Sequence, residues 1–350
     1  RPEHAAAVVQ LLDEGNTVPF IARYRKEQHG TMDDQTIRML SDRLNYLRGL
    51  ENRRAEVKNS IEEQGKLTPE LAGAIDAAST LAEVDDLYRP YRPKRRTRAS
   101  IARDKGLEPL AELLFSGKAD SSDPLVLAAR FTDPDKGVET PEEALAGARD
   151  ILAENLSDDA DIRKRLRLQM QKNGTLRSEA ATEEDTVYRL YYEYEEPIRR
   201  LQSHRVLAIN RGEKEGILKV SVQAGDAEAV SLILRCAVRP GHPFAALLQE
   251  VAEDAWDRLI FPSLEREIRS DLTDAANEQA IRTFALNLRP LLMQPPVKNR
   301  VTLGFDPAYR TGCKLAVVDG TGRVLETGVI YPTKPHNKTE AVSYTHLRAH

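Results

Sequence analysis

Cysteine is scarce in this sequence of 350 residues, which contains only Cys236 and Cys313. The two lie far apart and match neither a zinc-ligand spacing nor a C-x-x-C redox pair. An H-E-x-x-H motif is also missing. The sequence therefore predicts no metal centre, and two free thiols indicate a reducing compartment.

Long apolar runs are missing too, so no segment predicts a membrane-spanning helix. The N-terminal residues, from Arg1 to Ala5, begin without Met and lack the charged-then-apolar pattern of a signal peptide, so the start of the chain looks cut. Aromatic residues make up 5% of the chain and charged residues 30%, and the mean hydropathy is −0.50. These values are typical of soluble proteins built from amphipathic helices, and we expect a cytoplasmic protein without membrane contact.

Nucleotide-cofactor motifs are absent as well. The sequence has no G-x-x-x-x-G-K-(S/T) phosphate loop and no G-x-G-x-x-G after a strand, so we expect no cofactor. A nucleotide hydrolase would have to be built from scattered residues. The 41% of hydrophobic residues is nevertheless enough to fill the cores of two or three domains.

Helical periodicity dominates from Glu3 to about Leu292, with apolar residues three and four positions apart. The clearest helix is predicted from Asp33, as its N-cap, to Gln64, with Gly65 as the stop. Its apolar stripe, which we expect to be a packing face, consists of Ile37, Leu40, Leu44, Leu47, Leu50, Val57 and Ile61.

Several boundaries can also be read from the sequence. Helix starts are predicted at Thr68-Pro69, at Thr140-Pro141 and at Thr182, where a hydroxyl precedes Pro or early carboxylates. Short β-like runs occur at Ile217–Val222 and Val230–Leu234. These features mark element boundaries and carry no functional signal.

The period of the sequence changes near its end. Residues 244–292 predict one long central helix, bent at Pro262, and Pro295-Pro296 closes the helical region as the predicted domain boundary. Three strands are then predicted at Arg300–Phe305, Lys314–Asp319 and Gly322–Ile330. We therefore expect a mainly α chain. It has a multi-helix N-terminal region (residues 1–200), a small α/β insertion with the long central helix (201–295) and the truncated start of an α/β domain (297–342).

The segment LYRPYRPKRRTRAS, at residues 87–100, concentrates cations beside aromatic rings and prolines. Residues 89–105 have a local charge of +7, whereas the whole chain has −4, so the other residues sum to −11. The predicted phosphate contacts are Arg89, Arg92, Lys94, Arg95, Arg96 and Arg98. Tyr88 and Tyr91 offer ring faces to unpaired bases, and Pro90 and Pro93 would hold the chain extended. The alternative is a basic loop that pairs with acidic helices of the same protein.

Two further basic clusters and a group of tyrosines are candidate binding residues. A second patch for a phosphate or peptide partner consists of Arg199, Arg200, His204, Arg205 and Arg211. Equally, Ser203 could cap a helix and His204 could be an exposed first-turn residue. The basic cluster at residues 163–167 has no interleaved aromatic residue, which predicts a solvated helix face. Four tyrosines, expected on a helix and mostly as packing residues, are Tyr188, Tyr191, Tyr192 and Tyr194.

Four segments resemble one family, the bacterial Tex proteins, which are transcription accessory factors. They are VPFIARYRK at 18–26, the segment at 87–100, SHRVLAINRGEKEG at 203–216 and LGFDPAYRTGCKLAVVD at 303–319. The last is similar to the start of the YqgF-type, RNase H-like domain of that family. The resemblance continues to about Val342, and residues 343–350 look like foreign sequence from a cloning join.

The resemblance implies a helical N-terminal region, a long central helix and the RNase H-like domain. In the family, helix-hairpin-helix elements and an S1 domain follow, which this chain lacks. It also implies nucleic-acid binding, in large part through the S1 domain, and a role in transcription. We therefore expect an RNA-binding accessory fragment, whose electrostatic contacts to RNA or DNA tolerate any sequence and which has no catalytic activity.

Two alternatives stay open. The chain could be an interaction scaffold for RNA polymerase, or the complete protein could be an RNase H-like or resolvase-type nuclease. Asp306, at the end of the first predicted strand, is the candidate catalytic carboxylate. One carboxylate is not a two-metal site, and the YqgF-like domain of the family is regarded as lacking an intact nuclease site. The favoured interpretation of Asp306 is a turn residue that accepts backbone N–H bonds ahead of Pro307.

Overall fold

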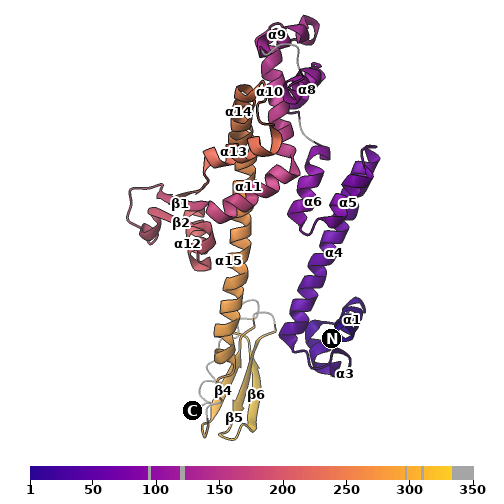
Figure 1. Cartoon of the computed structure of the whole chain (residues 1–350). Helices are drawn as coiled ribbons and strands as arrows, with labels where there is room; N and C mark the ends of the chain where they lie inside the picture. Colours follow the sequence, from indigo (N-terminus) through magenta and orange to yellow (C-terminus); the bar gives the residue numbers. More distant parts are fainter. Residues whose placement is uncertain (94–95, 119–122, 296–297, 309–310, 333–350) are drawn as a thin grey trace. The chain divides into compact units, whose positions relative to one another are not determined.

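Figure 1 shows the computed structural model, which describes residues 1–93, 96–118, 123–295, 298–308 and 311–332. The chain divides into two compact units, residues 1–278 and 279–350. The first unit is mainly helical, and the second contains the end of helix α15 and a three-stranded sheet. As predicted, the chain is mainly α and continues into the start of an α/β domain. No helix within the described ranges is both long enough and apolar enough to cross a membrane.

The N-terminal helices pack around the first half of a 30-residue helix, α4. They are α1 (Pro2–Asp13), α2 (Val18–Tyr24), α3 (Lys26–His29) and α4 itself (Asp34–Glu63). Asp33 Oδ1 accepts a hydrogen bond of 2.8 Å from the Thr36 amide, so the predicted N-cap is confirmed. A small core holds these helices together and consists of Val8, Leu11, Ile21 and Ile37.

The second half of α4 packs against α5 (Pro69–Ala77) and α6 (Leu81–Tyr88). Their shared core consists of Leu50, Val57, Ile61, Ile75, Ala78 and Val84. The predicted packing stripe of α4 is therefore confirmed near both of its ends. Leu47 is an exception: it lies on the stretch of α4 between the two small cores and is 45% exposed.

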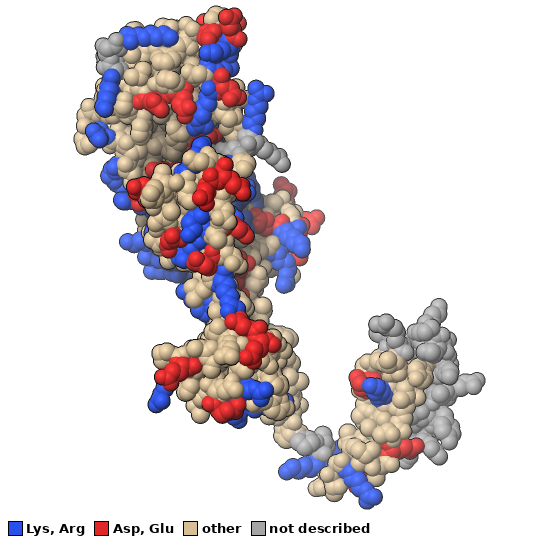
Figure 2. All heavy atoms as spheres, turned by 90° about the vertical axis from the view of Figure 1, so that its right-hand side faces the viewer, with Lys and Arg blue, Asp and Glu red and all other residues tan. Residues whose placement is uncertain are grey.

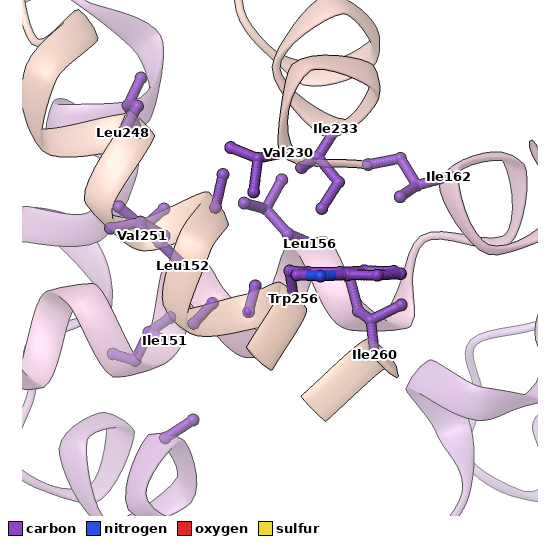
Figure 3. Packing of buried hydrophobic residues seen from close by; sticks show 14 of the residues in the cluster. Ile151, Leu152, Leu156, Ile162, Val230, Ile233, Leu248, Val251, Trp256 and Ile260 are labelled. Carbon is purple, nitrogen blue, oxygen red and sulfur yellow. The ribbon is translucent and has the colours of Figure 1, made fainter. Parts of the chain in front are cut away.

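A much larger core surrounds Trp256, the single tryptophan of the chain. Figure 3 shows its indole ring between Leu156 and Ile260, with Val230 and Ile233 nearby. The helices around it are α7 (Arg98–Asp104), α8 (Glu108–Ser116), α9 (Pro124–Ala128), α10 (Pro141–Asp158), α11 (Ala160–Asn173), α13 (Asp226–Ala237) and α14 (Ala245–Asp254). Short 3-10 turns lie between α9 and α10, namely η2 (Ala129–Phe131) and η3 (Pro134–Lys136). The buried indole N–H donates to Asp226 Oδ1 at 2.9 Å, so this large ring is buried without an unsatisfied donor.

The helix predicted over residues 244–292 is interrupted. After α14 comes a π-helical turn, Ala255–Ile260, which leads into α15, Phe261–Leu292. Pro262 has no amide hydrogen to donate to the carbonyl of Arg258, and a π turn widens the backbone just before it. The interruption therefore lies close to the predicted bend and coincides with the burial of Trp256.

A three-stranded antiparallel sheet of order β2-β1-β3 follows α11. Its strands are β1 (Thr175–Ala180), β2 (Glu193–Pro197) and β3 (Leu218–Gln223), and η5 (Ile198–Arg200) and α12 (Ser203–Lys214) connect β2 to β3. The strand predicted at 217–222 is confirmed as β3, whereas β1 and β2 were not predicted. The helix start at Thr182 is wrong, because the chain turns there between two paired strands and forms only a 3-10 turn, η4 (Arg189–Tyr191).

The strand predicted at Val230–Leu234 is also wrong, since this run lies within α13. Its β-branched residues suggested a strand. However, Ala229, Val230 and Ile233 are buried three and four positions apart, so they share one helical face.

The second unit contains the strands β4 (Thr302–Asp306), β5 (Cys313–Val318) and β6 (Val324–Ile330). They pair antiparallel in the order β4-β5-β6, and all three predicted strands are confirmed. Cys313, Leu315 and Ile330 are buried together. Pro296, part of the predicted boundary, and residues 343–350 lie outside the described residues.

Candidate nucleic-acid interface

The basic segment connects α6 to α7 in the first unit. Arg89–Tyr91 form a 3-10 turn, η1, directly after α6. The prediction that Pro90 holds this part extended is therefore wrong, because Pro90 lies at the start of a helical turn, where its missing amide hydrogen costs no hydrogen bond. Lys94 and Arg95 lie outside the described residues.

The far end of the segment is fixed by a capping box at the start of α7. Thr97 Oγ1 accepts a hydrogen bond of 3.0 Å from the Ser100 amide, and Ser100 Oγ accepts one of 2.8 Å from the Thr97 amide. Thr97 Oγ1 also donates to Glu154 Oε2 of α10 at 2.9 Å. The segment is thus tied at this end to the large core of the first unit.

Several cations of this region are tied to other parts of the fold. Arg89 Nε donates to Asp158 Oδ1 at 3.1 Å, and Arg103 Nη1 donates to Glu154 Oε1 at 2.8 Å. Both carboxylates belong to α10 and are buried, so each needs a cationic partner. Lys105 Nζ donates to a backbone carbonyl at 2.7 Å. Arg89 of the basic segment and Arg103 just after it thus pair with an acidic helix of their own chain.

Arg92, Arg96 and Arg98 differ from these tied cations. All three are exposed, and within the described part of the chain their guanidinium groups make no hydrogen bond or ion pair. A phosphate can therefore contact them without first breaking an internal pair. On the face shown in Figure 2, Lys and Arg side chains are interspersed with Asp and Glu side chains. That face therefore shows no broad positive surface.

Tyr88 and Tyr91 pack against the small core between α4 and α6. The hydroxyl groups of Tyr88 and Ser60 lie 2.9 Å apart, and the Arg53 guanidinium lies 5.5 Å from the centre of the Tyr88 ring. The Tyr91 carbonyl accepts a hydrogen bond of 2.9 Å from Gln64. Both rings therefore help to hold the segment on α4. The side chains of the segment that remain accessible to a partner are its exposed arginines.

The basic cluster at residues 163–167 was predicted to be solvated, and this is wrong for two of its arginines. Arg163 and Arg167 are 2% and 8% exposed. Arg163 Nε donates to Asp86 Oδ1 at 2.7 Å, and Arg167 Nη2 donates to Asp86 Oδ2 at 2.6 Å. Arg167 also pairs with Glu267 of α15. The ion pairs of these two arginines thus connect α6, α11 and α15 inside the fold. The one sequence feature that could have predicted them is Asp86, an acidic residue among the apolar positions of α6.

The second basic patch is only partly free. Arg199, Arg200, His204 and Arg211 are exposed around η5 and α12. Arg205, in contrast, donates from Nη1 to Glu196 Oε2 at 2.9 Å and is half-buried. The structure therefore brings the five residues to one region but ties one of them to β2. The residue before α12 is Gln202, so the proposed Ser203 cap is wrong.

The four tyrosines do not lie on a helix as predicted. Tyr191 ends the η4 turn, Tyr194 lies in β2, and their rings meet edge to face with centroids 5.3 Å apart. Tyr188 is buried, and the Tyr192 hydroxyl donates to the Glu184 carbonyl at 2.5 Å. These contacts stabilise the loop between β1 and β2, so the expected packing role holds although the helix does not.

Comparisons with known protein families match three domains in order along the chain. The Tex-like protein N-terminal domain matches residues 1–62, the Tex central region-like domain residues 119–284, and the Tex protein YqgF-like domain residues 300–349. The chain belongs to the Tex family. In this Tex family chain the basic segment lies between the first two matched ranges.

Curated relatives cover almost the whole chain. The identity is 49% to the uncharacterized protein YdcI of Bacillus subtilis, over 97% of this chain and 48% of the relative. It is 39% to the transcriptional accessory protein Tex of Neisseria gonorrhoeae, over 96% and 45%. It is 32% to the human S1 RNA-binding domain-containing protein 1, over 94% and 34%. The chain therefore spans about half the length of these two bacterial relatives.

Asp306 lies in the range of the YqgF-like match. It ends β4, is exposed and stands opposite Lys314 of β5 in the antiparallel register. Across the described residues, no group of three or more His, Cys, Asp or Glu side chains lies close enough together to hold a metal ion. Asp306 therefore offers one carboxylate at a strand end, as the sequence predicts.

Proposed function

We propose that this Tex family chain binds nucleic acid, RNA or DNA, as part of a transcription accessory factor. The observation that carries the proposal is that Arg92, Arg96 and Arg98 of the basic segment are exposed and, among the residues that the structure describes, make no hydrogen bond or ion pair. The names of two relatives agree with it, since one is called a transcriptional accessory protein and the other an S1 RNA-binding domain-containing protein.

The tied cations of the segment support this function indirectly. Arg89 and the capping box at Thr97 hold the residues on either side of Arg92 and Arg96 on the fold. Because these two positions are fixed before binding, a bound strand does not have to order them, which lowers the entropic cost of binding. Arginine contacts to phosphates read no base, so we expect similar affinity for unrelated sequences.

The test is a fluorescence-anisotropy titration of the 350-residue chain with single-stranded RNA and duplex DNA over a series of salt concentrations. A variant with Arg92, Arg96 and Arg98 all changed to Ala should bind both ligands more weakly. For RNA, the slope of the logarithm of the binding constant against the logarithm of the salt concentration should become less steep by about 2, because each lost phosphate contact in a single strand contributes about 0.7.

The matched control changes three other exposed arginines, Arg38, Arg165 and Arg189, to Ala. Each of these pairs with an acidic residue four positions earlier, so the control removes the same charge from arginines that already have an acidic partner. The control should keep most of the affinity. Equal losses of affinity in both variants would mean that nucleic acid is attracted by the overall charge of the protein and not by these three arginines. No binding at low salt would reject the proposal and favour the scaffold for RNA polymerase, whose mark is association that survives nuclease treatment.

We further propose that the chain has no nuclease activity, since two-metal phosphodiester cleavage needs several converging carboxylates and Asp306 is one. Incubation with Mg²⁺ and a four-way DNA junction should give no product, and Asp306→Asn should change nothing. Cleavage that requires Mg²⁺ and disappears in Asp306→Asn would contradict this.

A further inference from the structure

A cavity of about 700 Å³ opens beside the basic segment, between α4, α6, α11 and α15. Arg89 and Arg92 of the basic segment line it, together with Arg163 and Gln171 of α11 and Tyr46 of α4. Its volume is in the range of about 300–1,000 Å³ that is common for small-molecule sites. All of its lining residues belong to the first unit.

Four of the five acidic side chains that line this cavity are paired with basic residues, Glu267 with Arg167 among them; the fifth is Asp271, whose pKa is raised by burial. Glu83 accepts an ion pair of 2.7 Å from Lys164, and Asp85 one of 2.8 Å from Arg53. Asp86 is shared by two buried arginines, as described above. These carboxylates are therefore not available to neutralise the remaining cations of the cavity.

Arg163 has one donor nitrogen left over. Its Nε donates to Asp86, and its Nη2 donates to Ser263 Oγ at 3.2 Å. Its Nη1 is buried and has no hydrogen-bond partner among the described residues. A buried guanidinium N–H without an acceptor is costly, so its position beside a cavity indicates a place for an acceptor from outside the chain.

Six basic and five acidic side chains line the cavity, and two of the basic ones, Arg89 and Arg163, lie close enough for their charges to repel. Burial lowers the pKa of Arg89, and the charge of nearby Arg163 lowers it further. Arg92, which also lines the cavity, is exposed and makes no ion pair within the described ranges. An anion bound here would satisfy the Arg163 donor and reduce the repulsion between the guanidinium groups.

We propose that this cavity binds a phosphate group, which accepts hydrogen bonds from Arg163 Nη1, Arg89 and Arg92. A phosphate fits because it carries several acceptor oxygens and negative charge, and arginine forks match its geometry. The Tyr46 ring offers a surface for a base, so the ligand class is a nucleotide, either free or at the phosphorylated end of a strand. The inference goes beyond the proposed function, because a free nucleotide can bind here whether or not a strand binds the exposed arginines.

The first test uses calorimetric titration of the 350-residue chain with adenosine monophosphate and with adenosine. The nucleotide should bind at least about tenfold more tightly than the nucleoside, because only the nucleotide carries the phosphate. Arg92→Ala should remove most of this difference. Arg165→Ala, on the same helix as Arg163 but outside the cavity lining, should keep it. Equal affinity for both compounds, together with no preference for a phosphorylated strand end, overturns the inference.

The second test needs no variant of Arg163, which also supports the fold. Hydrogen exchange measured by mass spectrometry should slow in peptides from α6 and α11 when adenosine monophosphate is added, and not in α8. Protection confined to other regions overturns the site. A further comparison distinguishes a free nucleotide from the phosphorylated end of a strand as the ligand. Binding of RNA with a 5′-phosphate is compared with binding of the same RNA ending in a 5′-hydroxyl. A preference for the phosphorylated RNA, without binding of the free nucleotide, assigns the site to a strand end.

Discussion

At the scale of single residues, Asp86 has the most demanding position. It is 5% exposed and accepts hydrogen bonds from two arginines that are themselves buried. Desolvating three charges is costly, and it is offset only if the pairs stay complete. A change of Asp86 therefore removes the counter-charge of both arginines at once.

We predict that Asp86→Ala lowers the free energy of unfolding by about 3–5 kcal/mol, the usual cost of breaking a buried ion pair from one side. Urea denaturation followed by circular dichroism measures it. The control is Asp185→Ala, which removes a carboxylate from an exposed pair with Arg189 and should cost less than about 1 kcal/mol. Similar losses in both variants would show that the buried pairs add nothing special.

At the scale of elements, the stability of helix α4 depends on the hydrogen bond that caps its first turn. Asp33 caps it, whereas the neighbouring Asp34 makes an exposed ion pair of 3.6 Å with Arg38. Asp33→Ala should lower the free energy of unfolding by about 1 kcal/mol, because the Thr36 amide loses its acceptor. Asp34→Ala offers a control with the same change of charge. Equal effects in thermal denaturation would mean that charge at the helix start, and not the cap, matters.

Elements that are defined by local signals could be predicted from the sequence. Thr68 and Thr140 start α5 and α10 as expected, since each side-chain oxygen accepts a hydrogen bond from an amide of the first turn. β4, β5 and β6 follow one another and pair with their neighbours in the chain. In both cases the stabilising partner lies close in sequence.

Elements that depend on distant partners could not be predicted in the same way. β1 pairs with β3 more than thirty residues later, and its own sequence, TLRSEA, shows little alternation. The burial of Arg163 and Arg167 depends on Asp86, some eighty residues earlier. The candidate interface was found from its charge, but only the fold separates tied arginines such as Arg89 from exposed ones such as Arg92.

At the scale of the whole molecule, the described residues form cores of very unequal size. The core around Trp256 joins helices from α7 to α15, whereas the core of α1 to α4 contains only Val8, Leu11, Ile21 and Ile37. Buried apolar area is the main source of stability, so the small core should open first.

This inequality predicts that two probes of unfolding will disagree. Fluorescence reports Trp256 alone, since the chain has one tryptophan, whereas far-ultraviolet circular dichroism reports all helices. In urea, the circular-dichroism transition should begin at a lower concentration than the fluorescence transition. Coincident curves would show that the cores unfold as one cooperative unit.

The depth of the Asp86 pairs has one more consequence, for handling the protein. Dissolved ions screen exposed charges within about 3 Å at 1 M salt but reach buried pairs far less. Asp86 and Arg163 are buried, whereas Arg92, Arg96 and Arg98 face the solvent. A concentrated salt wash should therefore release co-purifying nucleic acid and leave the helices in place, so that the same sample can be loaded again after dialysis.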